Sequence, residues 1–275
     1  MAPFYCLRVH LVKEIWAAAF LGLMLCTVAS GAGFEVVAVT GQQAAGAEAG
    51  VFFEDLLTSG SRPHFNETGQ VMFAASLAGA NVDADNDGGL WLADSNSSNV
   101  LLLARQGDQA PGVPAGVIFG PDAFLKRPPF MGTSVVGNLN DAGQYLYWAD
   151  LAGTGVDDTN DAGLWSGTTS ADATLVARTG DQAAGFENGI VYSNLLRGAP
   201  VMNATGEIAF SGQVRGTGIS HLVNDDAIWR GTPASFDLFL QADTAAPGTT
   251  EKFRSQYSNG FGMLMDDQGQ MQVWS

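Results

Sequence analysis

The sequence predicts an all-β protein, arranged as a β-propeller-like array of four-stranded repeats behind an N-terminal signal helix. Three observations support this class. The 275 residues include 35 glycines and 15% charged residues, a composition that suits short strands joined by tight turns. Three motifs recur along the chain in a constant order. Beyond the N-terminal segment, no stretch shows the apolar periodicity of a helix.

The first motif has the form Asn-x-x-Gly-x-x-x-aromatic. Its glycines follow one another at intervals of 74, 63 and 63 residues, counting a weaker last copy. Asn can hydrogen-bond its own backbone and Gly accepts a positive φ, so the motif predicts a tight turn that leads into a strand. The copies span residues 66–73, 140–147, 203–210 and 266–273.

The second motif is a small residue, an apolar residue and a tryptophan. It lies 22 or 23 residues after the glycine of the first motif, and its tryptophans are Trp91, Trp165 and Trp229. We expect each of these side chains to fill the core between adjacent sheets. We therefore assign them no binding role.

The third motif closes each unit and has the form Ala-Arg-x-Gly-Asp-x-Ala. Residues 104–112 and 177–185 match each other closely, and residues 39–46 and 241–248 are more divergent copies. The aspartates of the two close copies, Asp108 and Asp181, would either face a pocket or have a structural role, capping a turn or pairing with Arg105 or Arg178. Because both occur at equivalent sites of the repeat, we favour the structural role.

Each unit predicts four short strands, which in the first unit are residues 51–57, 70–77, 89–93 and 100–105. Four strands in each 63 to 74 residues fit the blade of a propeller. An array of small β-sandwiches, one per repeat, is the alternative. It is less favoured because about 65 residues make a marginal independent core.

The first and last predicted strands, 36–40 and 270–274, belong to incomplete units. In one interpretation the first strand completes the last unit and closes a small ring. In the other, the chain is a fragment of a longer repeat protein. The last unit lacks a tryptophan-containing strand, and this absence favours the fragment.

Residues 1–32 have the layout of a signal peptide, with Arg8 and Lys13 before an apolar run over 15–28 and small residues after it. Cleavage after Ala32 would leave residues 33–275 as the repeat domain. The alternative is an uncleaved membrane anchor, because the apolar stretch approaches the ~20 residues that span a bilayer. Both cysteines lie in residues 1–32, so the cleaved chain would hold no disulfide and no thiolate site.

These motifs resemble those of the NxxGxxAF tandem-repeat proteins, which are bacterial exported or surface proteins of the choice-of-anchor, PEP-CTERM-associated type. The third copy matches best, with Asn203, Gly206, Ala209 and Phe210 in register, and the similarity covers about residues 36–275. The resemblance implies a secreted or cell-surface location. It implies no biochemical activity, and the chain departs from the pattern because it has no C-terminal sorting tail.

The charge of the chain narrows the classes of partner. The net charge is −16, with 12 lysines and arginines, so the sequence offers few cations for phosphate groups. This composition argues against nucleic-acid binding and against attraction to anionic lipid. Contact with a membrane is expected only through an uncleaved signal segment.

The best candidate for chemistry is the acidic run at Asp83, Asp85 and Asp87. Alternate carboxylates followed by glycine can converge on Ca²⁺, which takes oxygen ligands. The equivalent residues of the third unit are His221, Val223 and Asp225, so the repeat does not require a metal. A hairpin turn rich in Asp and Asn is the favoured alternative.

No serine-hydrolase elbow, phosphate-binding loop or dinucleotide fingerprint is present in the sequence, and we assign no catalytic or cofactor-binding residue. The sequence therefore favours an exported, non-enzymatic repeat protein that binds an extracellular ligand, either a glycan or a protein. The alternative is a secreted propeller glycosidase or lyase with carboxylates near the ring axis, which rests on fold analogy alone.

Overall fold

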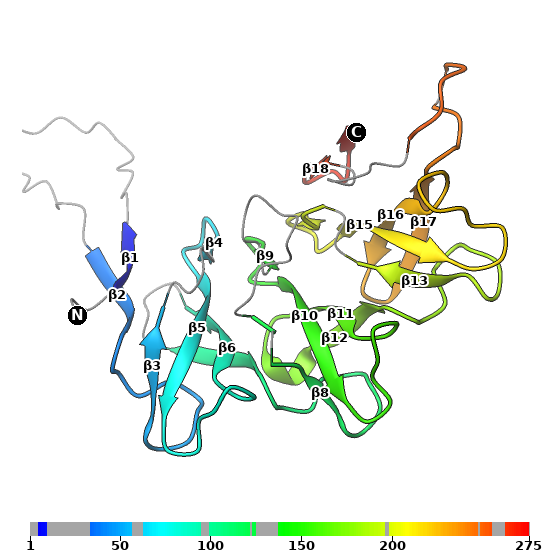
Figure 1. Ribbon diagram of the computed structural model, residues 1–275. Coiled ribbons are helices and arrows are strands. Elements are labelled where there is room, and N and C mark those ends of the chain that lie inside the picture. The colour runs from blue at the N-terminus through cyan, green and yellow to red at the C-terminus, as the bar shows by residue number, and fades with distance from the viewer. Residues whose placement is uncertain are drawn as a thin grey trace, which may run out of the picture.

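The computed structural model describes residues 5–9, 34–56, 63–94, 99–121, 123–124, 137–195, 198–246, 248–254 and 262–274. Within these ranges the chain has strands β1 to β19 and a 3-10 turn at Ser170–Asp172, and it has no α-helix. Three five-stranded antiparallel sheets follow one another along an open arc (Figure 1). A two-stranded sheet precedes the first of them and another follows the last. The predicted all-β class is therefore confirmed.

The first sheet shows the plan that the other two repeat. Its longest strand, β5 (Val71–Gly79), pairs along one edge with β6 (Gly88–Ala93), which pairs in turn with β7 (Val100–Arg105). The other edge of β5 is shared by two short strands. β4 (His64–Phe65) pairs with the first part of β5, and β3 (Val51–Asp55) pairs with the last part.

The second and third sheets keep this strand order. The second comprises β8 (Val117–Phe119), β9 (Gly137–Leu139), β10 (Tyr145–Gly153), β11 (Ala162–Gly167) and β12 (Thr174–Arg178). The third comprises β13 (Val191–Asn194), β14 (Val201–Met202), β15 (Ile208–Arg215), β16 (Asp226–Thr232) and β17 (Ser235–Gln241). The final pair is β18 (Gly262–Met265) and β19 (Met271–Trp274).

Each of the three large sheets has five strands, where the sequence predicts four per unit. The four predicted strands of the first unit correspond to β3, β5, β6 and β7. The strand that the sequence analysis missed is β4, together with its equivalents β9 and β14. These strands have two or three residues, which is too short for an alternating apolar pattern to be recognised.

The glycine of the first motif takes the backbone conformation that the sequence predicts. Gly69, Gly143, Gly206 and Gly269 have φ values of 88°, 79°, 84° and 76°. A side chain is strained in this left-handed region, which explains why glycine recurs there. In the three large sheets the turn that this glycine closes joins the short strand to the long one, as from β4 to β5, and Gly269 closes the turn from β18 to β19.

The sheets pack face to face through a shared core. Met72 and Leu103 of the first sheet belong to one buried cluster with Leu139 and Trp165 of the second. A second cluster joins residues of the second and third sheets in the same way. The three repeated tryptophans are completely buried, which confirms their predicted place in the core.

The N-terminal helix is the part of the predicted fold that the structure does not support. The apolar run over 15–28 lies outside the described residues. What is described of residues 1–32 is a strand, β1 (Tyr5–Val9), which pairs with β2 (Phe34–Val39). Among the described residues, no helix has the length and apolar character that crossing a membrane requires.

Candidate functional site

Most polar side chains that recur with the repeat serve the fold. The Asn66 side-chain amide donates to the carbonyl of Asn140 over 2.8 Å, and the Asn140 amide donates to the carbonyl of Asn203 over 2.9 Å. Each asparagine also accepts from backbone N–H groups of its own turn. These buried asparagines form a ladder that joins one unit to the next.

The third motif folds into a loop that its glutamine closes. The Gln109 side-chain amide donates to the carbonyls of Ala110 and Pro114, and its carbonyl oxygen accepts the N–H of Gly116 over 2.9 Å. Gln43 and Gln182 make the same bonds in their own loops. This glutamine occupies the same sequence position in the three loops, but its structural role is visible only in the folded chain.

The arginine of the third motif does not pair with the aspartate that follows it. The guanidinium of Arg105 donates to Glu48 over 2.7 Å and to the carbonyl of Asn86 over 3.0 Å. Loss of solvation raises the pKa of Asp108, and the charge of Arg105 opposes that rise. The pKa of Asp181 is raised for the same reason. Asp108 and Arg105 therefore form no ion pair, and Arg105 acts on Asp108 only through its charge at a longer distance.

The three candidate calcium ligands lie in the turn between β5 and β6. The Asp83 carboxylate accepts the N–H of Asp85 over 3.0 Å, and the side chain of Asn86 closes the turn. Burial raises the pKa of Asp87, and the charges of Glu54, Asp83 and Asp85 add to the rise.

Across the described ranges, no three His, Cys, Asp or Glu side chains gather in an arrangement that could hold a metal ion. The geometry of this turn is thus explained by its own hydrogen bonds. Calcium binding by Asp83, Asp85 and Asp87 stays a prediction that a titration can test.

In the third unit, the loop after β17 is the equivalent of the glutamine-closed loops, but its sequence differs from theirs. Asp243, with a φ of 67°, occupies the place of the motif glycine, and Ala245 occupies the place of the closing glutamine. The backbone bonds of the loop persist, because Ala245 still bridges to Lys252 as Gln109 bridges to Ile118. The loop therefore keeps the backbone conformation of the other loops but lacks the hydrogen bonds that the glutamine side chain makes in them.

A groove of about 460 Å³ opens beside this divergent loop. Leu222 and Val223, from the turn between β15 and β16, form part of its wall. The rest comes from Asp243 and residues 250–254. We call this feature the third-unit groove.

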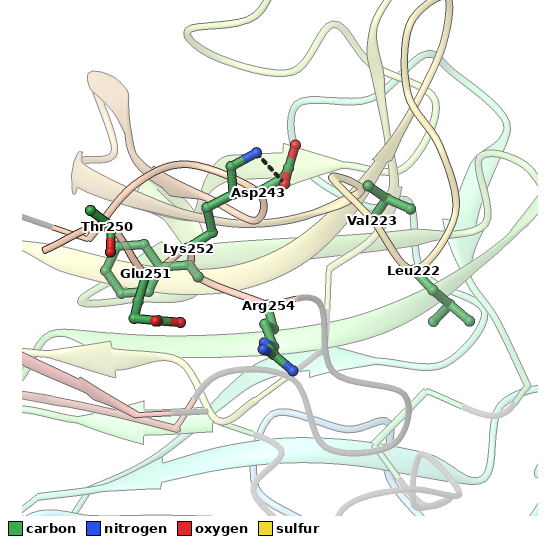
Figure 2. A pocket seen from close by; sticks show the side chains of 8 residues that line it. Leu222, Val223, Asp243, Thr250, Glu251, Lys252 and Arg254 are labelled. Carbon is green, nitrogen blue, oxygen red and sulfur yellow. Dashed lines mark hydrogen bonds and ion pairs between the residues drawn. The ribbon is translucent and has the colours of Figure 1, made fainter.

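Charged side chains surround the third-unit groove (Figure 2). Lys252 and Asp243 form an ion pair of 2.7 Å, while Arg254 and Glu251 extend away from that pair. Among the described residues, no hydrogen bond or ion pair engages the side chain of Arg254 or Glu251. Phe253 lies between them in the sequence and also lines the groove. The groove therefore offers a donor, an acceptor and an aromatic surface.

Apart from Asp243, these groove residues belong to none of the sequence motifs. The only signal in the sequence is that residues 241–248 match the third motif poorly. In a repeat protein, residues with a structural role make the same contacts in every unit. A loop whose sequence differs from its equivalents is therefore a place where those contacts are not required. The groove could be recognised only from the tertiary structure, because Leu222 and Lys252 are far apart in the sequence.

Comparison with known proteins identifies the family of the chain. Neither the curated proteins nor the solved structures include a match. One family model, described as a family of unknown function (DUF7453), matches twice, over residues 22–166 and over residues 120–274. The two matches overlap and together cover most of the chain, as expected for a sequence with internal repeats. The chain therefore belongs to the DUF7453 family.

Proposed function

We propose that this chain is an exported, non-enzymatic β-repeat protein that acts as an interaction module at the cell surface or outside the cell. The third-unit groove is its binding site. One observation carries the proposal: the recurring asparagines, glutamines and arginines are engaged in structural bonds, whereas Arg254 and Glu251 in the groove make none with the described residues. Binding residues on loops held by a rigid scaffold are a common arrangement.

The groove suits a ligand rich in hydroxyl groups. A guanidinium donates hydrogen bonds and a carboxylate accepts them, so Arg254 and Glu251 can together engage the hydroxyls of a glycan or polar groups of a protein. Phe253 supplies an apolar surface beside them. The groove holds charged side chains of both signs, so the net charge of −16 does not decide which ligands can bind in it.

We propose a β-propeller as the finer architecture, consistent with the resemblance to NxxGxxAF repeat proteins. Support comes from sheets that pack face to face in sequence order and from the asparagine ladder, which gathers the first turns of successive units. The signal segment and secretion are part of the same proposal. N-terminal sequencing of exported protein tests them, with Gly33 expected as the first residue.

The binding proposal is tested with an array of bacterial polysaccharides and immobilised extracellular proteins. We expect the full chain to retain at least one glycan or protein, and Arg254→Ala to reduce that binding about tenfold or more. Arg215→Ala is the matched control, because Arg215 donates to the carbonyl of Thr159 away from the groove. Equal loss in both variants, or no retained ligand, would contradict the proposal.

A secreted glycosidase is the competing function. It would need two carboxyl groups on either side of a bound sugar, and the groove contains Asp243 and Glu251. Asp243 is held by Lys252, which favours a structural role for this carboxylate. Release of reducing sugar from a bound polysaccharide, abolished by Glu251→Gln, would establish the enzyme instead.

A further inference from the structure

A second pocket, of about 270 Å³, opens where the second sheet meets the third. Its walls come from β12 of the second sheet, from β13 and the β16–β17 hairpin of the third, and from the loop that joins the two sheets. We call it the inter-unit pocket. It shares no lining residue with the third-unit groove.

The hairpin beside the inter-unit pocket differs from its equivalent in the second unit. There the connection between β11 and β12 contains the 3-10 turn Ser170–Asp172, which packs against β7 of the first sheet. In the third unit the connection is a two-residue turn, Pro233 and Ala234, between β16 and β17. Both residues line the pocket beside β12, the equivalent of β7. The pocket therefore lies where the preceding pair of units places the 3-10 turn.

The aspartate of the third motif lines this pocket and has no structural bond of its own. Only the backbone of Asp181 is engaged, because its carbonyl accepts the N–H of Tyr192 over 3.0 Å. Within the described ranges, no hydrogen bond or ion pair reaches the Asp181 carboxylate, and loss of solvation raises its pKa. The motif thus carries into the pocket a hydrogen-bond acceptor that the described fold does not use.

Tyr192 adds a hydrogen-bond donor to the same pocket. Its side chain is 4% exposed, and its hydroxyl accepts the N–H of Ala184 over 3.1 Å. The hydroxyl proton has no acceptor among the described residues. The equivalent residues Phe53 and Phe119 make the same backbone bonds to their loops but have no hydroxyl. The donor therefore occurs in this unit and not in the two before it.

Apolar side chains complete the wall. Leu175 and Val176 of β12 and Phe236 of β17 are half-buried and line the pocket. The ring of Phe236 packs edge-on against Phe210 with centroids 5.4 Å apart, a contact that fixes its orientation. A ligand here would meet an apolar surface beside one acceptor and one donor.

We propose that the inter-unit pocket binds one sugar ring of a neutral glycan. Sugar hydroxyls donate to the Asp181 carboxylate and accept from the Tyr192 hydroxyl, while the C–H face of the ring packs on Phe236. The volume lies just below the ~300 Å³ at which pockets for larger ligands begin, so it suits a single ring. This site is additional to the third-unit groove and does not rest on binding there.

A basic side chain of a protein partner suits the inter-unit pocket less well. An ammonium group has donors only, so it would satisfy Asp181 and leave the Tyr192 proton without an acceptor. It would also meet the charge of Arg178, which lines the same pocket. A sugar hydroxyl both donates and accepts, and it carries no charge.

Saturation-transfer NMR of the full chain with glucose, galactose, mannose and N-acetylglucosamine tests the proposal. We expect at least one sugar to bind, and Asp181→Asn to raise its Kd about fivefold or more, because a charge-assisted hydrogen bond is lost. Asp108→Asn is the matched control, since Asp108 holds the equivalent position beside Phe119. It should bind the sugar like the unmodified chain. Arg254→Ala should do the same, which separates this site from the third-unit groove.

Tyr192→Phe gives a second test of the pocket. Phenylalanine fills the equivalent place in two units, so the variant should fold, as thermal unfolding will check, and its Kd for the sugar should rise about threefold. The absence of binding by all four sugars would overturn the proposal. Equal weakening by Asp108→Asn and Asp181→Asn would also overturn it. A lysine-rich peptide that binds in place of any sugar, and that Asp181→Asn releases, would make the pocket a site for a basic protein instead.

Discussion

The indole N–H of Trp91 donates a hydrogen bond of 2.8 Å to the carbonyl oxygen of Ala45, 46 residues earlier. The bond ties the third strand of the first sheet to the loop that precedes that sheet. Trp165 and Trp229 make the same bond to Pro111 and Ala184. The recurring tryptophan therefore fills the core and also holds the loop between consecutive units.

Replacing this tryptophan should destabilise the whole arc. Trp165 is completely buried and stacks on Tyr147 with ring centroids 5.7 Å apart. Trp165→Phe removes the bond to Pro111 and leaves a cavity, so we expect a loss of about 2–4 kcal/mol in the free energy of unfolding. Urea denaturation followed by circular dichroism measures it. Trp148→Phe, at a partly buried position, should cost less, and an equal cost would contradict this role.

Two neighbouring tyrosines should respond in opposite ways to loss of the hydroxyl. The Tyr147 hydroxyl is buried with no hydrogen-bond partner among the described residues, and Phe73 occupies the equivalent place in the first unit. Burial raises the pKa of Tyr147 well above its ordinary value, so the hydroxyl stays neutral. Tyr147→Phe should leave stability unchanged or raise it by about 1 kcal/mol.

Tyr145→Phe is the matched comparison. The Tyr145 hydroxyl donates to the carbonyl of Thr169 over 2.7 Å, so its removal should cost about 0.5–1.5 kcal/mol. Thermal unfolding of both variants gives the comparison. A larger loss in Tyr147→Phe than in Tyr145→Phe would show that the buried hydroxyl has a partner.

His64 should make stability depend on pH. Its Nε2 is buried with no hydrogen-bond partner among the described residues, and burial lowers the pKa of its imidazole below the ordinary value of about 6.5. The unfolded chain therefore binds a proton more readily than the folded chain. The free energy of unfolding should fall as the pH drops from about 6.5 toward the folded pKa, and should be insensitive to this residue above about pH 7.5.

His64→Asn isolates this effect, because Asn138 occupies the equivalent place in the second unit. Chemical denaturation at several pH values should give a flatter profile for the variant between about pH 5 and 7. Two parallel profiles in that range would mean that His64 titrates alike in the folded and unfolded chains.

Replacing Asp85 in the acidic turn of the first unit with threonine, the residue at the equivalent position of the second unit, should stabilise that turn. Thr159 donates its hydroxyl to the Asp157 carboxylate over 2.6 Å. Asp85→Thr should provide the same bond to Asp83 and remove a negative charge that acts on Asp87. We expect a higher midpoint of thermal unfolding in the presence of a chelator.

Calcium gives the second arm of this experiment. If Asp83, Asp85 and Asp87 hold Ca²⁺, millimolar calcium should raise the midpoint of the unmodified chain and leave that of Asp85→Thr unchanged. If calcium shifts neither protein, or shifts both equally, the turn is a hairpin and the metal prediction is wrong.

The sequence by itself determined the local structure of this protein. The longer strands, the positive φ of Gly69 and the burial of Trp91 could all be predicted, because alternation, turn chemistry and hydrophobicity act over a few residues. Repetition strengthened each inference, since a pattern seen three times is unlikely to arise by chance. The calcium prediction lacks this support, because the three aspartates at 83, 85 and 87 are not all repeated in the other units.

Only the tertiary structure decided which distant groups meet. No spacing in the sequence indicates that Arg105 binds Glu48, that Asn66 donates to Asn140, or that residues 250–254 form a groove with Leu222. These contacts depend on how sheets pack on one another, and that packing is set by the summed shape of many buried side chains. Local patterns predict the longer strands of each unit, and the packing between units creates the sites.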